Sequence, residues 1–219
     1  MRTSLLRRLA VPALISACAL GLSAQQKKAP AKAAAPAAST AKLGPGEYAT
    51  FNTNKGTFVA QLYTKEAPKS VANFVALAEG KRPYKDPLTG TLSMAKLYNG
   101  LLFFRSIPDY LIQTGDPLNN GTGRLGYTIP YEKNSLSFDQ PGRMALAQAP
   151  GDMSSRGSQV FFVLKAVPQM DKQGFLIIGQ IVQGLDVAVA LSQGPRKNGA
   201  NDIPQYPNVL RSVTIQDVK

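Results

Sequence analysis

The chain has 219 residues, 44% of them hydrophobic and 8% aromatic, enough for one domain with a sizeable core. Because it has no histidine and a single cysteine, Cys18, it excludes Ser-His-Asp and Cys-His catalysis, zinc sites built from these residues, and intrachain disulfides. The formal net charge is +12, but seven of the 25 lysines and arginines precede Glu47, whereas all 13 acidic residues lie from Glu47 onward. The part of the chain from Glu47 onward therefore has a net charge of only +5, which predicts no specific nucleic-acid partner.

The first 24 residues resemble an export signal. Three arginines precede an apolar stretch, residues 9–22, which is shorter than the about 20 apolar residues of a membrane span. Leu22-Ser23-Ala24 is similar to a signal-peptidase site, and cleavage there would leave a soluble protein in the periplasm or medium. Ile15-Ser16-Ala17-Cys18 resembles instead a bacterial lipobox, in which the signal ends at residue 17 and Cys18 is lipidated. Both interpretations predict an exported bacterial protein.

Residues 25–46 form a second segment, built from alanine, proline, lysine and small polar residues. Leu43 is its single large apolar side chain, so the segment cannot bury enough surface to offset the entropy of ordering it. Its prolines favour a semi-extended chain. We therefore expect a disordered tether that leads to a folded domain spanning residues 47–219.

The folded domain begins with a predicted β-hairpin and a helix. Tyr48–Asn52 and Thr57–Tyr63 are expected to be strands because they flank a turn that contains asparagine and glycine. Pro68–Glu79 is predicted to be helical, since its apolar residues recur on one face, a proline opens it and a glycine follows it. Residues 81–97 are polar, contain proline and glycine, and are predicted to be a loop.

Two short apolar runs follow, Leu101–Phe104 and Tyr110–Ile112, and both are typical of buried strands. Arg105 follows the first run and Gln113 follows the second. A cation beside a wall of aromatic side chains is costly to desolvate without a partner, so Arg105 is expected to face a groove rather than a sealed core. An arginine on a solvated strand face is the alternative.

The remaining chain alternates loops with short elements. Gly121–Gly126 matches the G-x-G-x-x-G pattern, but Pro130 stands where a dinucleotide-binding helix would run, so a glycine-rich loop is expected. Strands are predicted at 142–147 and 209–218, and a short helix at Gly184–Gln193. Many short strands with only two helices predict a mostly β fold that closes into an antiparallel barrel.

The stretch from Tyr98 to Pro117 resembles the central signature of the cyclophilins, which are peptidyl-prolyl cis-trans isomerases. The residues that carry the resemblance are Tyr98-Asn99-Gly100, Phe104-Arg105-Ser106-Ile107-Pro108 and Tyr110-Leu111-Ile112-Gln113-Thr114-Gly115-Asp116-Pro117. Gly157–Leu164 and Met170–Gly179 are similar to later parts of the family pattern, and the likeness extends from about Tyr48 to Val218. It implies a closed eight-stranded antiparallel barrel capped by two α-helices.

The resemblance also implies a site for non-covalent catalysis that needs no cofactor. Arg105 is expected to donate to the prolyl nitrogen of a twisted X-Pro bond, with Gln113 orienting it or holding the substrate carbonyl. The proline pocket and the backbone groups that receive the peptide are expected from Tyr110, Leu111, Ala147, Gln148, Phe161, Met170 and Phe175. The expected partners are proline-containing unfolded or extended polypeptides, bound by a monomer that reaches a membrane only through a lipid anchor.

Five positions depart from the family pattern. Phe104 replaces a histidine, Thr114 a glycine, Gln148 an asparagine, Gln169 an aromatic residue and Phe175 a histidine or tyrosine. Thr114 is expected to add a side chain near the floor of the groove. The changes at Thr114, Gln148 and Gln169 leave open a second hypothesis, a proline-peptide-binding module or chaperone with weak catalysis. A third, an adhesion or nucleic-acid-binding protein, depends on the basic tail alone.

Overall fold

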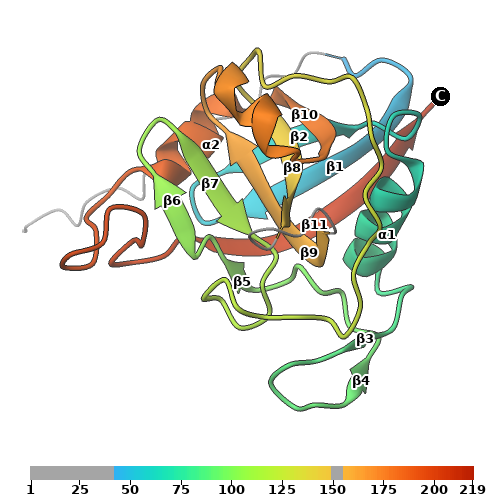
Figure 1. The fold of residues 1–219 in the computed structure, drawn as a ribbon, viewed down its shortest axis with the longest axis horizontal. Coiled ribbons are helices and arrows are strands. Elements are labelled where there is room, and N and C mark those ends of the chain that lie inside the picture. The colour runs from blue at the N-terminus through green and yellow to red at the C-terminus, as the bar shows by residue number, and fades with distance from the viewer. Residues whose placement is uncertain (1–41, 149–154) are drawn as a thin grey trace, which may run out of the picture. The chain divides into compact units, whose positions relative to one another are not determined.

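The computed structural model describes residues 42–148 and 155–219. The predicted export signal, Cys18 and residues 25–41 of the predicted tether lie outside the described residues. The described chain is mostly β, as predicted, and its two α-helices flank a curled nine-stranded sheet (Figure 1). None of the helices in the described ranges combines the length and apolar composition that a membrane crossing requires.

Every neighbouring pair of strands in the large sheet is antiparallel. The strand order across the sheet is β5 (Leu101–Leu102), β11 (Val209–Val218), β1 (Gly46–Thr53), β2 (Thr57–Leu62), β10 (Ile177–Gln183), β8 (Arg143–Gln148), β9 (Ser155–Val163), β7 (Leu111–Thr114) and β6 (Arg105–Ile107).

The prediction of a closed eight-stranded barrel is wrong. The sheet is a half-barrel of nine strands, and within the described residues β5 and β6 each pair with one neighbour only. The predicted single strand Leu101–Phe104 ends at Leu102, and a new strand begins at Arg105. The loop before β11 explains this break, because its Asn208 and Asp202 carbonyls accept hydrogen bonds from the backbone of Phe103 and Ser106. A loop therefore covers the outer edge of β6.

The helices agree with the sequence prediction, and one predicted loop does not. Helix α1 (Pro68–Glu79) has the predicted bounds, and α2 (Leu185–Ser192) is one residue shorter at each end. Helix α1 contacts β11, and α2 contacts β2, β6 and β7 (Figure 1). Residues 81–97, predicted to be a loop, instead contain a separate two-stranded hairpin, β3 (Tyr84–Lys85) and β4 (Leu92–Ser93).

The core has two parts because strand neighbours point to opposite faces. On β9, Phe162 joins the larger cluster, where its ring makes edge contacts with Phe51 and Phe58 at 5.2 Å. Phe161, the residue before it, joins a smaller cluster on the other face, together with Phe138 and other residues. The smaller cluster lies beside the candidate site and supplies its apolar wall.

The glycine-rich stretch Gly121–Gly126 is a loop, as predicted, and its glycines serve a buried carboxylate. Asp116 is fully buried, and it accepts hydrogen bonds from the backbone of Leu118, Asn120 and Gly121 at 2.9, 3.1 and 2.5 Å. A Cβ atom at Gly123 would lie 1.8 Å from an Asp116 oxygen, so only glycine fits there.

A distant carboxylate caps the N-terminus of α1. Ala67 occupies the N-cap position, and its side chain cannot accept a hydrogen bond. Glu132 takes this role, accepting bonds from the backbone of Lys69 and Ser70 at 3.0 and 2.8 Å and from the Ser70 hydroxyl at 2.6 Å. Partial burial raises the pKa of Glu132, but these hydrogen bonds outweigh burial and lower the pKa below its ordinary value of 4.5.

We predict that Glu132→Gln lowers the free energy of unfolding by about 1 kcal/mol at neutral pH, through loss of a charged cap. Because the folded-state pKa is depressed, the carboxylate's contribution is present above the ordinary value and is lost as the pH falls through the depressed pKa. Urea denaturation of both proteins at pH 7 and pH 3 measures the difference, which should shrink at pH 3.

Glu66→Gln is the matched control, because Glu66 lies exposed just before α1 and accepts no hydrogen bond from it in the described structure. Equal losses in the two variants, or a Glu132→Gln loss that does not depend on pH, would contradict the capping role.

Candidate active site

A groove of about 450 Å³ opens on the β6, β7, β8 and β9 side of the sheet. Its walls combine apolar side chains with a few polar groups, the pattern typical of a ligand site. The lining residues are Phe104, Arg105, Leu111, Gln113, Asn119, Asn120, Gly121, Ala147, Gln148, Phe161, Met170, Phe175, Lys197, Asp202 and Ile203.

Eight of the nine residues predicted for the site line this one groove: Arg105, Gln113, Leu111, Ala147, Gln148, Phe161, Met170 and Phe175. Tyr110 does not line it. Its ring is half-buried against the smaller core cluster, and the Lys165 ammonium lies 5.2 Å from the ring centroid.

Strand register places the central groups of the groove side by side. Arg105 on β6 pairs with Gln113 on β7, Gln113 pairs with Phe161 on β9, and Phe161 pairs with Ala145 on β8. Residues directly opposite each other in an antiparallel sheet share a face. Leu111, two residues before Gln113, belongs to the same face. A cation, an amide and an aromatic ring therefore follow one another across three strands.

The guanidinium of Arg105 has two partners. Its Nε donates to the Asp202 carboxylate at 2.8 Å, and its Nη1 is 3.5 Å from the Gln113 Oε1 atom. The Arg105 and Asp202 side chains are 41% and 39% exposed, so the pair lies at the rim of the groove in contact with solvent. The charge of Arg105 is thus available to a ligand rather than sealed in the core.

The amide of Gln113 is fixed from behind. Its Nε2 donates to the Gln159 Oε1 atom at 3.1 Å, and Gln159 in turn donates to the backbone carbonyls of Gly121 and Gly123 at 3.4 Å. Both glutamines are buried. This chain of amides directs the Gln113 oxygen towards Arg105 and connects the strand to the glycine-rich loop.

The apolar wall of the groove is the exposed edge of the smaller core cluster. The Phe161 ring meets Phe175 edge-on, with centroids 5.0 Å apart, and stacks on Phe138 at 6.0 Å. Leu111 and Met170 are 3% and 5% exposed, so they present little surface but shape the wall. A flat apolar ring, such as that of proline, suits a wall of this kind.

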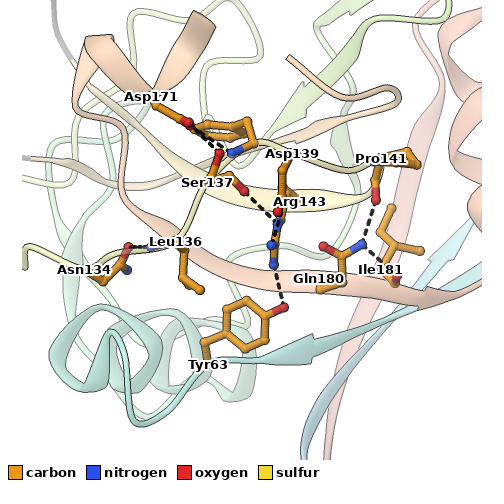
Figure 2. Close-up of polar contacts among 11 residues, drawn as sticks. Tyr63, Asn134, Leu136, Ser137, Asp139, Pro141, Arg143, Asp171, Gln180 and Ile181 are labelled. Atoms are coloured by element: carbon orange, nitrogen blue, oxygen red, sulfur yellow. Dashed lines mark hydrogen bonds and ion pairs between the residues drawn. The ribbon is translucent and has the colours of Figure 1, made fainter. Parts of the chain in front are cut away.

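Beneath this wall, a buried arginine fixes the segment that carries Phe138. Figure 2 shows Arg143 pointing into the group formed by Tyr63, Ser137 and Asp139. It donates to the Tyr63 hydroxyl at 2.9 Å, to the Ser137 carbonyl at 3.0 Å and to the Asp139 carboxylate at 2.8 Å. Hydrogen bonding from Arg143 lowers the pKa of Asp139, whereas burial raises the pKa of Tyr63.

A second carboxylate completes this arrangement. Asp171 accepts a hydrogen bond from the Ser137 hydroxyl at 2.5 Å (Figure 2). It accepts a second one from the Phe138 backbone at 2.9 Å. Asp171 belongs to the short 3₁₀ helix η1 (Pro168–Gln173), which also supplies Met170 to the groove. The hydrogen bonds of Arg143 and Asp171 therefore hold the segment that carries Phe138, and Phe138 packs behind the apolar wall of the groove.

Three of the five departures from the family pattern do not obstruct the groove. Thr114 is fully buried and donates to the Leu102 carbonyl at 2.9 Å, so the expectation of a side chain at the groove floor is wrong. Phe104 lines the groove but is only 8% exposed, and Gln169 is exposed and is not a lining residue. Gln148 does line the groove, and its amide donates to the Gly174 carbonyl at 2.9 Å.

The sequence prediction missed two loops that line the groove. One is Asn119–Gly121, next to the buried Asp116, and the other contributes Lys197, Asp202 and Ile203 from the segment before β11. Neither segment has a hydrophobic period, and Asp202 lies 97 residues from Arg105. Spacing along the chain therefore gave no signal for this ion pair.

Comparisons with known proteins identify the family of this chain and agree with its fold. Residues 48–217 match the family described as cyclophilin type peptidyl-prolyl cis-trans isomerase/CLD. Peptidyl-prolyl cis-trans isomerase B of Streptomyces anulatus is 38% identical over 173 residues, which cover 77% of this chain and 96% of that protein. Peptidyl-prolyl cis-trans isomerase A of Mycobacterium tuberculosis is 34% identical over 169 residues, with 76% and 91% covered.

A solved structure shows the same fold. A Cryptosporidium parvum cyclophilin type peptidyl-prolyl cis-trans isomerase, crystallised in the presence of the dipeptide Ala-Pro, superposes with a TM-score of 0.64 at 24% identity, covering 78% of this chain and 99% of that one. The chain belongs to the cyclophilin-type peptidyl-prolyl cis-trans isomerase family. It is a peptidyl-prolyl cis-trans isomerase, as the sequence predicted.

We predict that Arg143→Ala lowers the free energy of unfolding by about 2–3 kcal/mol, because it removes a buried side chain and its three hydrogen bonds, two of which go to the half-buried residues Tyr63 and Ser137. The loss of support for Phe138 should also raise the KM for a proline-containing peptide. Urea denaturation and isomerase kinetics measure the two effects. Arg211→Ala, which removes an exposed arginine from β11, is the control and should change neither. If Arg143→Ala destabilises the protein but leaves the KM unchanged, the hydrogen bonds of Arg143 do not determine the shape of the groove.

Proposed function

We propose that Arg105 is the catalytic group of this isomerase and that the groove wall binds the proline ring. The observation that supports this proposal is a guanidinium at the rim of an apolar groove, in one row with Gln113 on the next strand and Phe161 on the strand after it. The substrates are proline-containing unfolded or extended polypeptides.

The chemistry follows from the peptide bond. Rotation about X-Pro must remove partial double-bond character, with a barrier of about 18–20 kcal/mol. In the twisted state the prolyl nitrogen regains a lone pair, so a fixed donor aimed at that nitrogen stabilises the twisted state more than either planar state. Arg105 supplies such a donor without proton loss, since its guanidinium is always charged. No covalent intermediate is needed.

The magnitudes are compatible with this mechanism. An acceleration of about 10⁵-fold corresponds to about 7 kcal/mol of transition-state stabilisation. One charged donor in a partly desolvated groove, together with the positioning of the proline ring against Phe161, supplies an effect of that order. In this mechanism Gln113 either orients Arg105 or holds the substrate carbonyl, and the backbone of Ala147 and Gln148 receives the extended peptide.

The alternative function, a peptide-binding module with weak catalysis, now has less support. It was motivated by the residues at positions 114, 148 and 169, and only Gln148 lines the groove. Gln148 keeps an amide at its position, so the polar character of the groove is preserved there.

We predict that Arg105→Ala lowers kcat/KM by at least about tenfold, because the donor to the prolyl nitrogen is lost. Arg105→Lys should recover only part of the activity, since a point charge lacks the planar fork. A protease-coupled proline-peptide assay on the full chain measures this, with Arg211→Ala as the control for charge removal. Thermal unfolding should change little, since a half-exposed ion pair adds little stability. Wild-type turnover by Arg105→Ala would exclude the mechanism.

For location, we propose that the protein is exported and anchored through Cys18. The large Leu22 fits a signal-peptidase site poorly, and residues 25–46 have the composition of a tether that would give an anchored domain reach. The acyl chains of a lipoprotein satisfy the two-signal requirement for stable anchoring.

We predict that the full chain, expressed in a bacterium that processes lipoproteins, partitions with membranes, and that Cys18→Ser releases it. Fractionation with N-terminal sequencing measures both. A soluble wild-type protein that begins at Gln25 would show that cleavage follows Ala24 instead, and the isomerase mechanism would be unaffected.

A further inference from the structure

We infer that Asp202 is a positioning residue for Arg105, a role that rests on the catalysis proposed above. The Asp202 Oδ2 atom accepts a hydrogen bond from Arg105 Nε at 2.8 Å, and both residues line the groove. Asp202 belongs to the loop between α2 and β11, which is distant in sequence from β6 and β7, the strands that carry Arg105 and Gln113. This loop therefore supplies the carboxylate that sets the orientation of the catalytic cation.

The loop is folded so that Asp202 is brought to β6 by its backbone as well as by its side chain. The Asp202 carbonyl accepts a hydrogen bond from the backbone of Ser106, the residue after Arg105, at 2.9 Å. The two arms of the loop are joined by a bond from the Lys197 backbone to the Ile203 carbonyl at 3.0 Å. The carboxylate thus stays within reach of the guanidinium even when the pair's charge interaction is screened by salt.

The division of donors on Arg105 supports a positioning role. Asp202 takes Nε, and Gln113 Oε1 lies 3.5 Å from Nη1, whereas Nη2 has no hydrogen-bond partner in residues 42–148 and 155–219. Because the guanidinium is planar, hydrogen-bond partners on two of its nitrogens fix the plane of the whole group and therefore the direction of its third nitrogen. The Nη2 group then remains for the substrate, in a plane that Asp202 and Gln113 determine.

A contribution to folding stability does not explain this pair. The two side chains are 41% and 39% exposed, and ion pairs exposed to this degree contribute about 0–1 kcal/mol. A misplaced catalytic group, by contrast, costs a large factor in rate. We therefore expect removal of the carboxylate to affect turnover more than unfolding.

Steady-state kinetics of the full chain test the inference. Asp202→Ala should lower kcat about fivefold with KM changed by less than about twofold, since the inferred role of the carboxylate is to orient Arg105 and not to bind the peptide. Asp202→Asn should lie between Asp202→Ala and wild type, because it keeps an acceptor without the charge. Asn201→Ala is the matched control, because it changes the same loop at a residue that does not line the groove.

A double-mutant cycle identifies the partner through which Asp202 acts. In an Arg105→Ala background, Asp202→Ala should cause no further loss of kcat, because residues that act as one unit are not additive. An equal loss in both backgrounds would overturn the inference. An unchanged kcat in Asp202→Ala would also overturn it. An increased kcat would overturn it as well and would indicate that Asp202 competes with the substrate for Arg105.

Nitrogen-15 NMR of the arginine side chains provides a readout that does not depend on activity. The Arg105 Nε–H group should be ordered in the wild type and mobile in Asp202→Ala, with Asn201→Ala like the wild type. Equal order in wild type and Asp202→Ala would overturn the positioning role. A wild-type protein without isomerase activity would instead contradict the proposed function, and the NMR comparison would still decide how Arg105 is held.

Discussion

The register of β6, β7 and β9 is the constraint on which the site depends. Arg105 lies opposite Gln113, and Gln113 lies opposite Phe161, so groups of three chemical kinds emerge side by side on one face. Because side chains alternate along a strand, a slip of one residue in either pair would send a member of this row to the other face. A short hydrogen-bonded ladder thus decides that a cation stands beside an apolar wall.

Segments outside the strands complete the site, and each is held by a buried or half-buried charged group. Asp116 fixes the loop that follows β7, and Arg143 fixes the segment that carries Phe138 behind the wall. Asp202 joins the loop before β11 to Arg105. The strands therefore set the direction of the catalytic groups, whereas the charged side chains that hold the loops set how closely the groove surrounds them.

Local pattern predicted the elements well where one physical signal dominated. The helix Pro68–Glu79 has a single apolar face with proline and glycine at its ends, and its bounds were predicted correctly. The family resemblance predicted eight of the fifteen residues that line the groove, and three of these, Arg105, Leu111 and Gln113, belong to the short motif around Arg105. The prediction of a closed barrel failed because a loop, and not another strand, forms a backbone hydrogen bond with β6, and no local sequence pattern indicates that contact. The partnership of Arg105 with Asp202 had no local signal, since only the folded chain brings these residues together.

The proposed mechanism requires a proline ring to bind against Phe161 with its nitrogen in reach of Arg105. A crystal structure of the protein with a short proline-containing peptide tests this most directly. We expect the proline ring to lie between Phe161 and Leu111, with an Arg105 nitrogen directed at the prolyl group. A peptide bound elsewhere, such as in the shallow hollow along α1 between Pro68 and Glu79, would contradict it.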